Sequence, residues 1–85
     1  MVQAIKFYAD WCGPCKMYSK VWSKVEEELK DKINFKQINV DNDTSGLAAE
    51  YKVRSIPFTV IIDEKGETTS KTGLLNEGEL KELLK

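Results

Sequence analysis

The sequence predicts an α/β domain in which three helices flank a four-stranded mixed sheet, in the order β-α-β-α-β-β-α. The first observation behind this prediction is that short, β-prone apolar segments alternate with segments of helical period. The second is the strand, helix and strand that open the chain, an order that favours a parallel strand pair. The third is a hairpin turn at residues 63–66, which adds antiparallel strands at the far edge. Because 85 residues can enclose one core, residues 1–85 are expected to form a single domain.

The first half of the chain supplies two strands and one long helix. Val2–Tyr8 is mostly apolar and is expected to be a central strand that is buried on both faces. From about Cys15 to Lys30 apolar residues recur at helical spacing, with charged residues on the opposite side. Ile33–Val40 predicts the second strand. The apolar positions of the helix are Tyr18, Val21, Trp22, Val25 and Leu29.

The second half of the chain is expected to form two short helices around a hairpin. Thr44–Tyr51 predicts a helix behind an N-cap at Asp43 or Thr44. Phe58–Ile62 predicts the third strand, and the polar segment Glu67–Thr72 fits a strand at a sheet edge. Asn76 and Glu79 have the spacing of a capping box, which predicts a last helix through Leu84.

Composition excludes several classes of function. The chain has 13 Lys and Arg against 14 Asp and Glu, and its isoelectric point is about 5.4, so no basic field attracts nucleic acid. No apolar window is long enough to span a membrane, and the first residues lack the pattern of a signal peptide. We therefore expect a cytoplasmic monomer with neither nucleic acid nor membrane as partner. The absence of His excludes mechanisms that need an imidazole base or a His metal ligand.

One segment carries chemistry: Trp11-Cys12-Gly13-Pro14-Cys15-Lys16, between a buried strand and the start of a helix. A Cys-x-x-Cys pair in this context indicates redox activity. A structural bridge is one alternative, although so short a loop would stabilise the fold by only ~2 kcal/mol. A zinc site is another, but two Cys without His would need a second chain to complete four ligands.

The spacing assigns a role to each residue of this motif. If the helix begins near Cys12, unpaired N–H groups and the helix dipole stabilise its thiolate, which is the nucleophile. Cys15, one turn further in, is expected to be more buried and to resolve the mixed disulfide. Gly13 would let another backbone approach closely, and Pro14 suits the first helical turn.

Four segments resemble successive signatures of the thioredoxin family and cover the chain nearly end to end. They are F-Y-A-D-W-C-G-P-C-K-M at Phe7–Met17, I-N-V-D at Ile38–Asp41, V-R-S-I-P at Val53–Pro57 and K-T-G at Lys71–Gly73. The resemblance implies a thioredoxin-like fold and a protein-disulfide reductase with no cofactor beyond a redox-active Cys12–Cys15 disulfide. It also implies two kinds of partner, disulfide-containing proteins and a thioredoxin reductase or its equivalent.

The same resemblance implies how substrate is bound. Pro57 would follow a cis peptide bond opposite the cysteines, and the Ile56 backbone would pair with substrate as a short strand. Trp11, Gly73 and Leu74 would complete an apolar docking surface.

The chain departs from the family pattern at its start and in its core. About 20 residues, one strand and one helix, are absent before Val2, which leaves four strands in place of five. Lys6 and Gln37 replace a buried Asp, which serves proton transfer at the second Cys, and the Lys opposite it. Lys20 replaces a Pro that kinks the long helix.

Two hypotheses stand for Lys6. In the first, its stem packs in the core and its ammonium reaches solvent. In the second, its amine lies near Cys15 and either lowers the pKa of that thiol or relays its proton.

Two other functions stand beside the reductase. A glutaredoxin-like or isomerase role would use the same cysteines, although the Gly-Pro dipeptide between them favours the reductase by resemblance. The module could instead be an assembly subunit that needs no redox chemistry.

Overall fold

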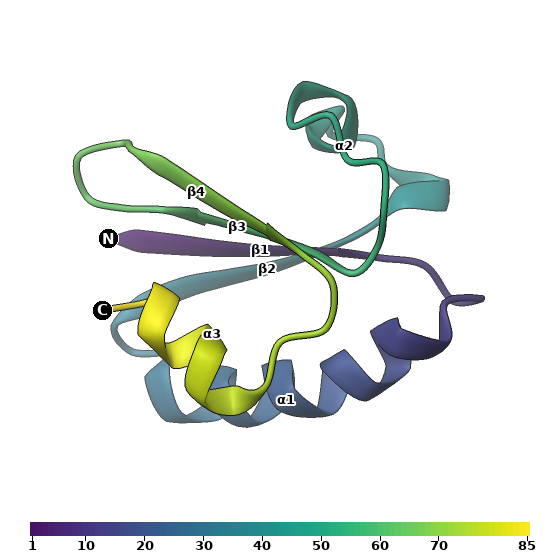
Figure 1. The fold of residues 1–85 in the computed structure, drawn as a ribbon. Coiled ribbons are helices and arrows are strands. Elements are labelled where there is room, and N and C mark those ends of the chain that lie inside the picture. The colour runs from purple at the N-terminus through teal and green to yellow at the C-terminus, as the bar shows by residue number, and fades with distance from the viewer.

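A four-stranded sheet carries two helices on one face and one short helix on the other (Figure 1). The computed structural model describes residues 1–85. The predicted order of strands and helices is confirmed, with an added 3₁₀ turn (Val40–Asn42). The elements are β1 (Val2–Tyr8), α1 (Gly13–Leu29), β2 (Ile33–Asn39), α2 (Leu47–Glu50), β3 (Phe58–Ile62), β4 (Thr68–Thr72) and α3 (Glu77–Leu83).

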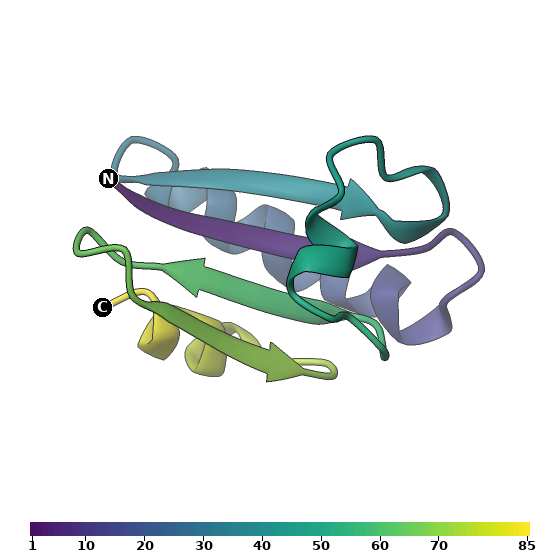
Figure 2. The same cartoon turned by 90° about the horizontal axis from the view of Figure 1, so that it is seen from above.

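The sheet is mixed, as predicted, with strand order β2-β1-β3-β4 (Figure 2). β1 runs parallel to β2 and antiparallel to β3, and the hairpin adds β4 antiparallel to β3. The central strand β1 is buried from Ala4 to Phe7, whereas every residue of the edge strand β4 is exposed. The site-bearing loop after β1 therefore starts from the most firmly held strand of the sheet.

Helix α1 begins at Gly13, two residues before the predicted start. Pro14 is tolerated in the first turn because its fixed φ suits a helix and its missing N–H would have had no partner there. The Cys12 side chain caps the turn by accepting the N–H of Cys15. As predicted, the apolar stripe faces the sheet, with Tyr18 and Trp22 fully buried.

Helix α2 is shorter than predicted, and neither Asp43 nor Thr44 is its N-cap. The carboxylate of Asp43 accepts the N–H groups of Ser45 and Gly46, which holds a turn ahead of the helix, and also that of Ala48 in its first turn. Gly46 is the N-cap and adopts φ of 78°, a left-handed conformation that interrupts the helix there. Side-chain hydrogen bonds to the backbone thus compete with helix formation over residues 43–46.

Four other boundaries shift by one residue, the first of which is the end of α1 at Leu29 in place of Lys30. β2 ends at Asn39, not Val40, because the Asn39 side chain accepts the N–H of Asp41 and starts the 3₁₀ turn. β4 begins at Thr68 because the turn bonds to Asp63 include the N–H of Glu67. α3 ends at Leu83, and its predicted capping box between Asn76 and Glu79 is present.

The core is divided by the sheet. The larger cluster lies between the sheet and helices α1 and α3, with Trp22 against the rings of Tyr18 and Phe35. The smaller cluster lies under α2, centred on Ile5, Phe7 and Val60. No helix is both long and apolar enough to cross a lipid bilayer.

Candidate functional site

The two cysteines lie where β1 passes into α1. A disulfide joins Cys12 to Cys15, with their Cα atoms 5.2 Å apart. Cys15 is 1% exposed and Cys12 5% exposed, so the first cysteine is the more accessible one. They pack against Ala9 and the half-buried Ile56, which places the sulfur atoms at the boundary between core and surface.

The sulfur of Cys12 faces the positive end of α1. Cys12 is the N-cap residue, and its Sγ lies 3.1 Å from the backbone nitrogen of Cys15, which donates to it. No acidic side chain occupies the first turn of this helix. The N-terminal N–H groups and the dipole of a 17-residue helix therefore favour negative charge at this sulfur atom.

A second segment, Ile56–Pro57, lies 44 residues further along the chain and contacts Cys12. The Ile56–Pro57 peptide bond is cis. The carbonyl oxygen of Ile56 lies 3.8 Å from the Sγ of Cys12, and the Ile56 N–H has no partner within the chain. A free N–H beside the Cys12 sulfur can pair with the backbone of an extended peptide.

The loop after β4 holds this segment in place. Gly73 donates its N–H to the carbonyl oxygen of Pro57 at 2.8 Å. The φ of Gly73 is 98°, which a residue with a side chain rarely adopts. Leu74, the next residue, is 44% exposed. Three segments far apart in sequence therefore meet around the disulfide.

Trp11 is exposed beside the sulfur atoms. It is 70% exposed, yet its indole N–H donates to Asp41 at 2.7 Å, which fixes its orientation. Between Trp11 and α2 lies a cavity of about 310 Å³. Its lining is apolar except for Arg54 and consists of Trp11, Val40, Ala48, Ala49, Val53, Arg54 and Ile56.

The sequence did not single out Asp41, Arg54 or Met17. Met17 is 61% exposed and forms with Leu74 the rim of a second apolar cavity, of about 250 Å³. A large apolar side chain directly after the motif at residues 11–16 is the signal that could have found it. Asp41 and Arg54 give no such signal, because only the fold places them beside Trp11.

If the cysteines reduce disulfides of other proteins, as the family resemblance implies, Asp41→Ala should lower kcat/KM for a protein disulfide about threefold, because loss of one charge-assisted hydrogen bond frees the indole. Turnover of a small aromatic disulfide, which does not need the indole, should stay unchanged. Kinetics on both substrates check this, with Asn42→Ala as the exposed neighbouring control. Equal loss on both substrates would show that Asp41 does not act through Trp11.

Gly13 and Pro14 form the outer surface of the disulfide ring. Both are exposed, and nothing lies within 4 Å of the position where a side chain on Gly13 would begin. The space over this ring is open to an approaching backbone.

Lys6 does not reach solvent, so the first hypothesis for it is wrong. It is 0% exposed, and its Nζ donates to the hydroxyl of Ser19 at 3.0 Å. The rings of Tyr8 and Trp22 lie 5.3 and 5.7 Å from the same nitrogen. Burial lowers the pKa of Lys6 to about 8, although Glu26 opposes this shift. Gln37, its register partner on β2, is exposed.

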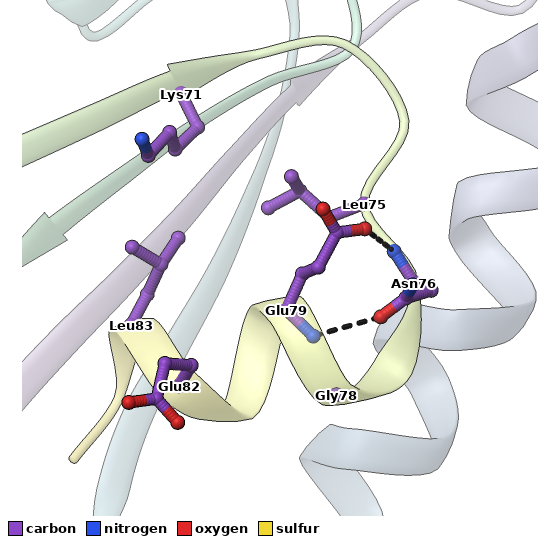
Figure 3. Close-up of a pocket in the computed structure, with 7 residues that line it drawn as sticks. All are labelled: Lys71, Leu75, Asn76, Gly78, Glu79, Glu82 and Leu83. Atoms are coloured by element: carbon purple, nitrogen blue, oxygen red, sulfur yellow. Dashed lines mark hydrogen bonds between the residues drawn. The ribbon is translucent and has the colours of Figure 1, made fainter.

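The largest cavity is away from the cysteines. It measures about 610 Å³ and lies between β4 and α3, where Leu75 and Leu83 point inward and Glu79 folds back onto Asn76 (Figure 3). The carboxylate of Glu79 is occupied by the capping box. No group of three or more His, Cys, Asp or Glu side chains is placed to hold a metal ion.

Comparisons with known proteins agree on one family. The family model described as Thioredoxin matches residues 2–85. A thioredoxin of Mycoplasmoides gallisepticum is 42% identical over 81 residues, which cover 95% of this chain and 79% of that protein. A thioredoxin of Pyropia yezoensis is 46% identical over 63 residues, which cover 74% of this chain and 57% of that protein.

Solved structures give the same result for the fold. The chloroplastic thioredoxin z superposes with a TM-score of 0.86 at 26% identity, over 99% of this chain and 75% of that one. The thioredoxin of Fasciola hepatica superposes with a TM-score of 0.85 at 29% identity, over 98% of this chain and 77% of that one.

Proposed function

Because this chain belongs to the thioredoxin family, we propose that it reduces disulfides of other proteins through Cys12 and Cys15. The observation that carries the proposal is the placement of the Cys12–Cys15 disulfide at the start of a helix, beside the free backbone N–H of Ile56. Residues 1–85 act as one unit, a monomer, with this disulfide as the only redox group. Its expected place is a reducing compartment, the cytoplasm.

Cys12 performs the first step. In the reduced protein its thiolate, stabilised by the N-terminal N–H groups of α1, attacks one sulfur of the substrate disulfide. A bond forms between Cys12 and that sulfur, and the other substrate sulfur leaves with the electron pair and takes a proton from water. The product is a mixed disulfide.

Cys15 performs the second step. Its thiol loses a proton, and the thiolate attacks the Sγ of Cys12, which is within bonding reach because the two residues are one turn apart. The bond to the substrate breaks, so the substrate gains two electrons and the pair of cysteines loses them. A thioredoxin reductase or an equivalent donor then returns two electrons to the Cys12–Cys15 disulfide.

Substrate lies across the surface around Cys12. The Ile56 backbone beside Pro57 pairs with an extended substrate segment, as the free N–H supports. Trp11 and Leu74 supply apolar contact on either side, while Gly73 fixes the position of Pro57. Gly13 and Pro14 leave the outer side of the Cys12–Cys15 disulfide ring open to substrate. Exposed apolar side chains around a reactive sulfur are typical of a surface that binds other proteins.

Turnover with protein disulfides tests the proposal. With insulin as substrate and dithiothreitol as electron source, we expect the protein to speed reduction at least tenfold over dithiothreitol alone, because Cys12 is ionised more readily than a free thiol. Glutathione should be a poor electron source. A rate equal to that of dithiothreitol alone would refute the reductase, and strong glutathione dependence would point to a glutaredoxin-like role.

A further inference from the structure

A fully buried lysine, Lys6, lies on the strand that leads into the cysteine motif and has no part in the mechanism above. Lys6 donates one hydrogen bond, to Ser19, although an ammonium carries three donors. None of the ion pairs of the chain includes it. A buried ammonium without a carboxylate is costly, and the rings of Tyr8 and Trp22 offset only part of that cost.

Ser19 connects this lysine to Cys15. The two residues are four apart on α1, so their side chains lie on the same face, one turn from each other. Both line a cavity of about 370 Å³ together with Tyr8, Ala9, Asp10 and Lys16. Asp10, Lys16 and Ser19 contribute polar groups to its wall, and a cavity of this size has room for water. The Ser19 hydroxyl therefore bonds to Lys6, and Ser19 borders the same cavity as Cys15.

Among the basic side chains near Ser19, Lys6 is buried and Lys16 is exposed. Its register partners, Gln37 on β2 and Thr59 on β3, carry no charge. From α1, Tyr18 is occupied by a 2.7 Å hydrogen bond to Thr59, and Glu26 is the carboxylate whose charge acts on Lys6. The cavity adds two charged groups that face Cys15, which are Asp10 and Lys16.

The resolving step needs a proton acceptor. Cys15 is 1% exposed, and a buried thiol gives up its proton less readily than an exposed one. We propose that Lys6 is a positioning residue for this step, and that its amine draws the Cys15 proton through the Ser19 hydroxyl and the adjoining cavity. This inference rests on the proposed function and assigns the proton path of its second half.

A neutral Lys6 amine accepts a proton from Ser19 as Ser19 accepts one, through water, from the Cys15 thiol, which leaves an ammonium and a thiolate. The thiolate attacks Cys12, the substrate thiolate leaves with the electron pair, and the ammonium returns its proton to water. A pKa of about 8 means that the Lys6 amine can take up and release a proton near neutral pH.

Stopped-flow reaction of the reduced protein with dithiobis-nitrobenzoate, which releases a coloured thiolate, separates the two steps. The first equivalent reports attack by Cys12, and the second reports resolution by Cys15. We expect Lys6→Met to slow the second phase about tenfold at pH 7, less than the ~10²–10⁴ of a directly placed base because water can also accept the proton. The first phase should stay within about twofold of the wild type.

The pH profile distinguishes a proton path from a packing role. In the wild type the rate of the second phase should rise with pH around a midpoint near 8, and in Lys6→Met this midpoint should move upward by about one pH unit or more. Ser19→Ala should slow the same phase while it leaves the lysine in place. The matched control is Lys20→Met, an exposed lysine of the same helix, which should change neither phase.

Two results would overturn the inference. One is a second phase in Lys6→Met with the wild-type rate and midpoint. The other is Asp10→Asn reproducing the loss while Ser19→Ala does not, which would assign the proton to the cavity carboxylate. Absence of a fast first phase in the wild type would instead refute the proposed function itself.

Discussion

The Cys12→Ser variant is expected to lose protein-disulfide reduction completely, down to the rate of the reductant alone, which removes the whole acceleration of about tenfold or more expected of the wild type. A hydroxyl at this position cannot form the mixed disulfide, and the one remaining thiol, that of Cys15, is only 1% exposed. Cys15→Ser should behave differently, because Cys12 still attacks and the product cannot be resolved. Insulin reduction and mass spectrometry of the Cys15→Ser protein after exposure to a protein disulfide measure the two effects.

The loss in Cys12→Ser should not come from unfolding. A disulfide across so short a loop stabilises the fold by only ~2 kcal/mol, and Ser can still cap α1. Far-ultraviolet circular dichroism should therefore match the wild type. A Cys12→Ser/Cys15→Ser protein that kept full biological function would favour the assembly-subunit alternative, and a Cys15→Ser protein without adducts would contradict the order of the two steps.

The parts of the site that are local in sequence were predictable. The motif at residues 11–16 sits between a strand and a helix, and Pro14 beside a capping Cys12 fixes where the helix starts. The polar strand β4 and the capping box at Asn76 are likewise readable from side-chain chemistry alone. The cis bond before Pro57 was expected only from the family resemblance, because an X-Pro sequence does not specify its isomer.

The parts that depend on tertiary contacts were not predictable. Nothing near Asp41 in sequence indicates that it holds Trp11, because the two are 30 residues apart. The predicted start of α2 was wrong because Asp43 bonds the N–H groups of Ser45 and Gly46 in a turn ahead of the helix, and the N-cap is Gly46. For Lys6 the error was physical: solvation usually draws an ammonium to the surface, but α1 covers this one completely.

Lys6→Met is expected to stabilise the oxidised protein at pH 7 by about 2 kcal/mol. The pKa of Lys6 falls from 10.5 to about 8 on folding, because burial disfavours the ammonium. At about 1.4 kcal/mol per pKa unit, a shift of this size means that the charge on Lys6 destabilises the folded state by about 3 kcal/mol. Met fills a similar volume without charge, although the Ser19 hydroxyl loses its partner, which offsets part of the gain.

The sign of the pH dependence follows from proton binding. Between pH 8 and pH 10.5 the unfolded chain keeps the Lys6 proton that the folded chain has released. Unfolding then takes up a proton, so the free energy of unfolding of the wild type rises with pH across this window. Below pH 8 both states are protonated and the cost is fully present. The advantage of Lys6→Met should therefore be largest at pH 7 and nearly vanish at pH 10.

Urea unfolding of both proteins at pH 7 and pH 10 measures this difference, and the comparison cancels the titration of the groups that they share. Lys20→Met, in which an exposed lysine changes in the same way, should alter stability by less than about 0.5 kcal/mol at either pH. Destabilisation by Lys6→Met at pH 7 would mean that the ammonium gains more from Ser19 and the two rings than burial costs it. A gain that persisted unchanged at pH 10 would mean that the charge is not its cause, and that Met simply packs better against Trp22.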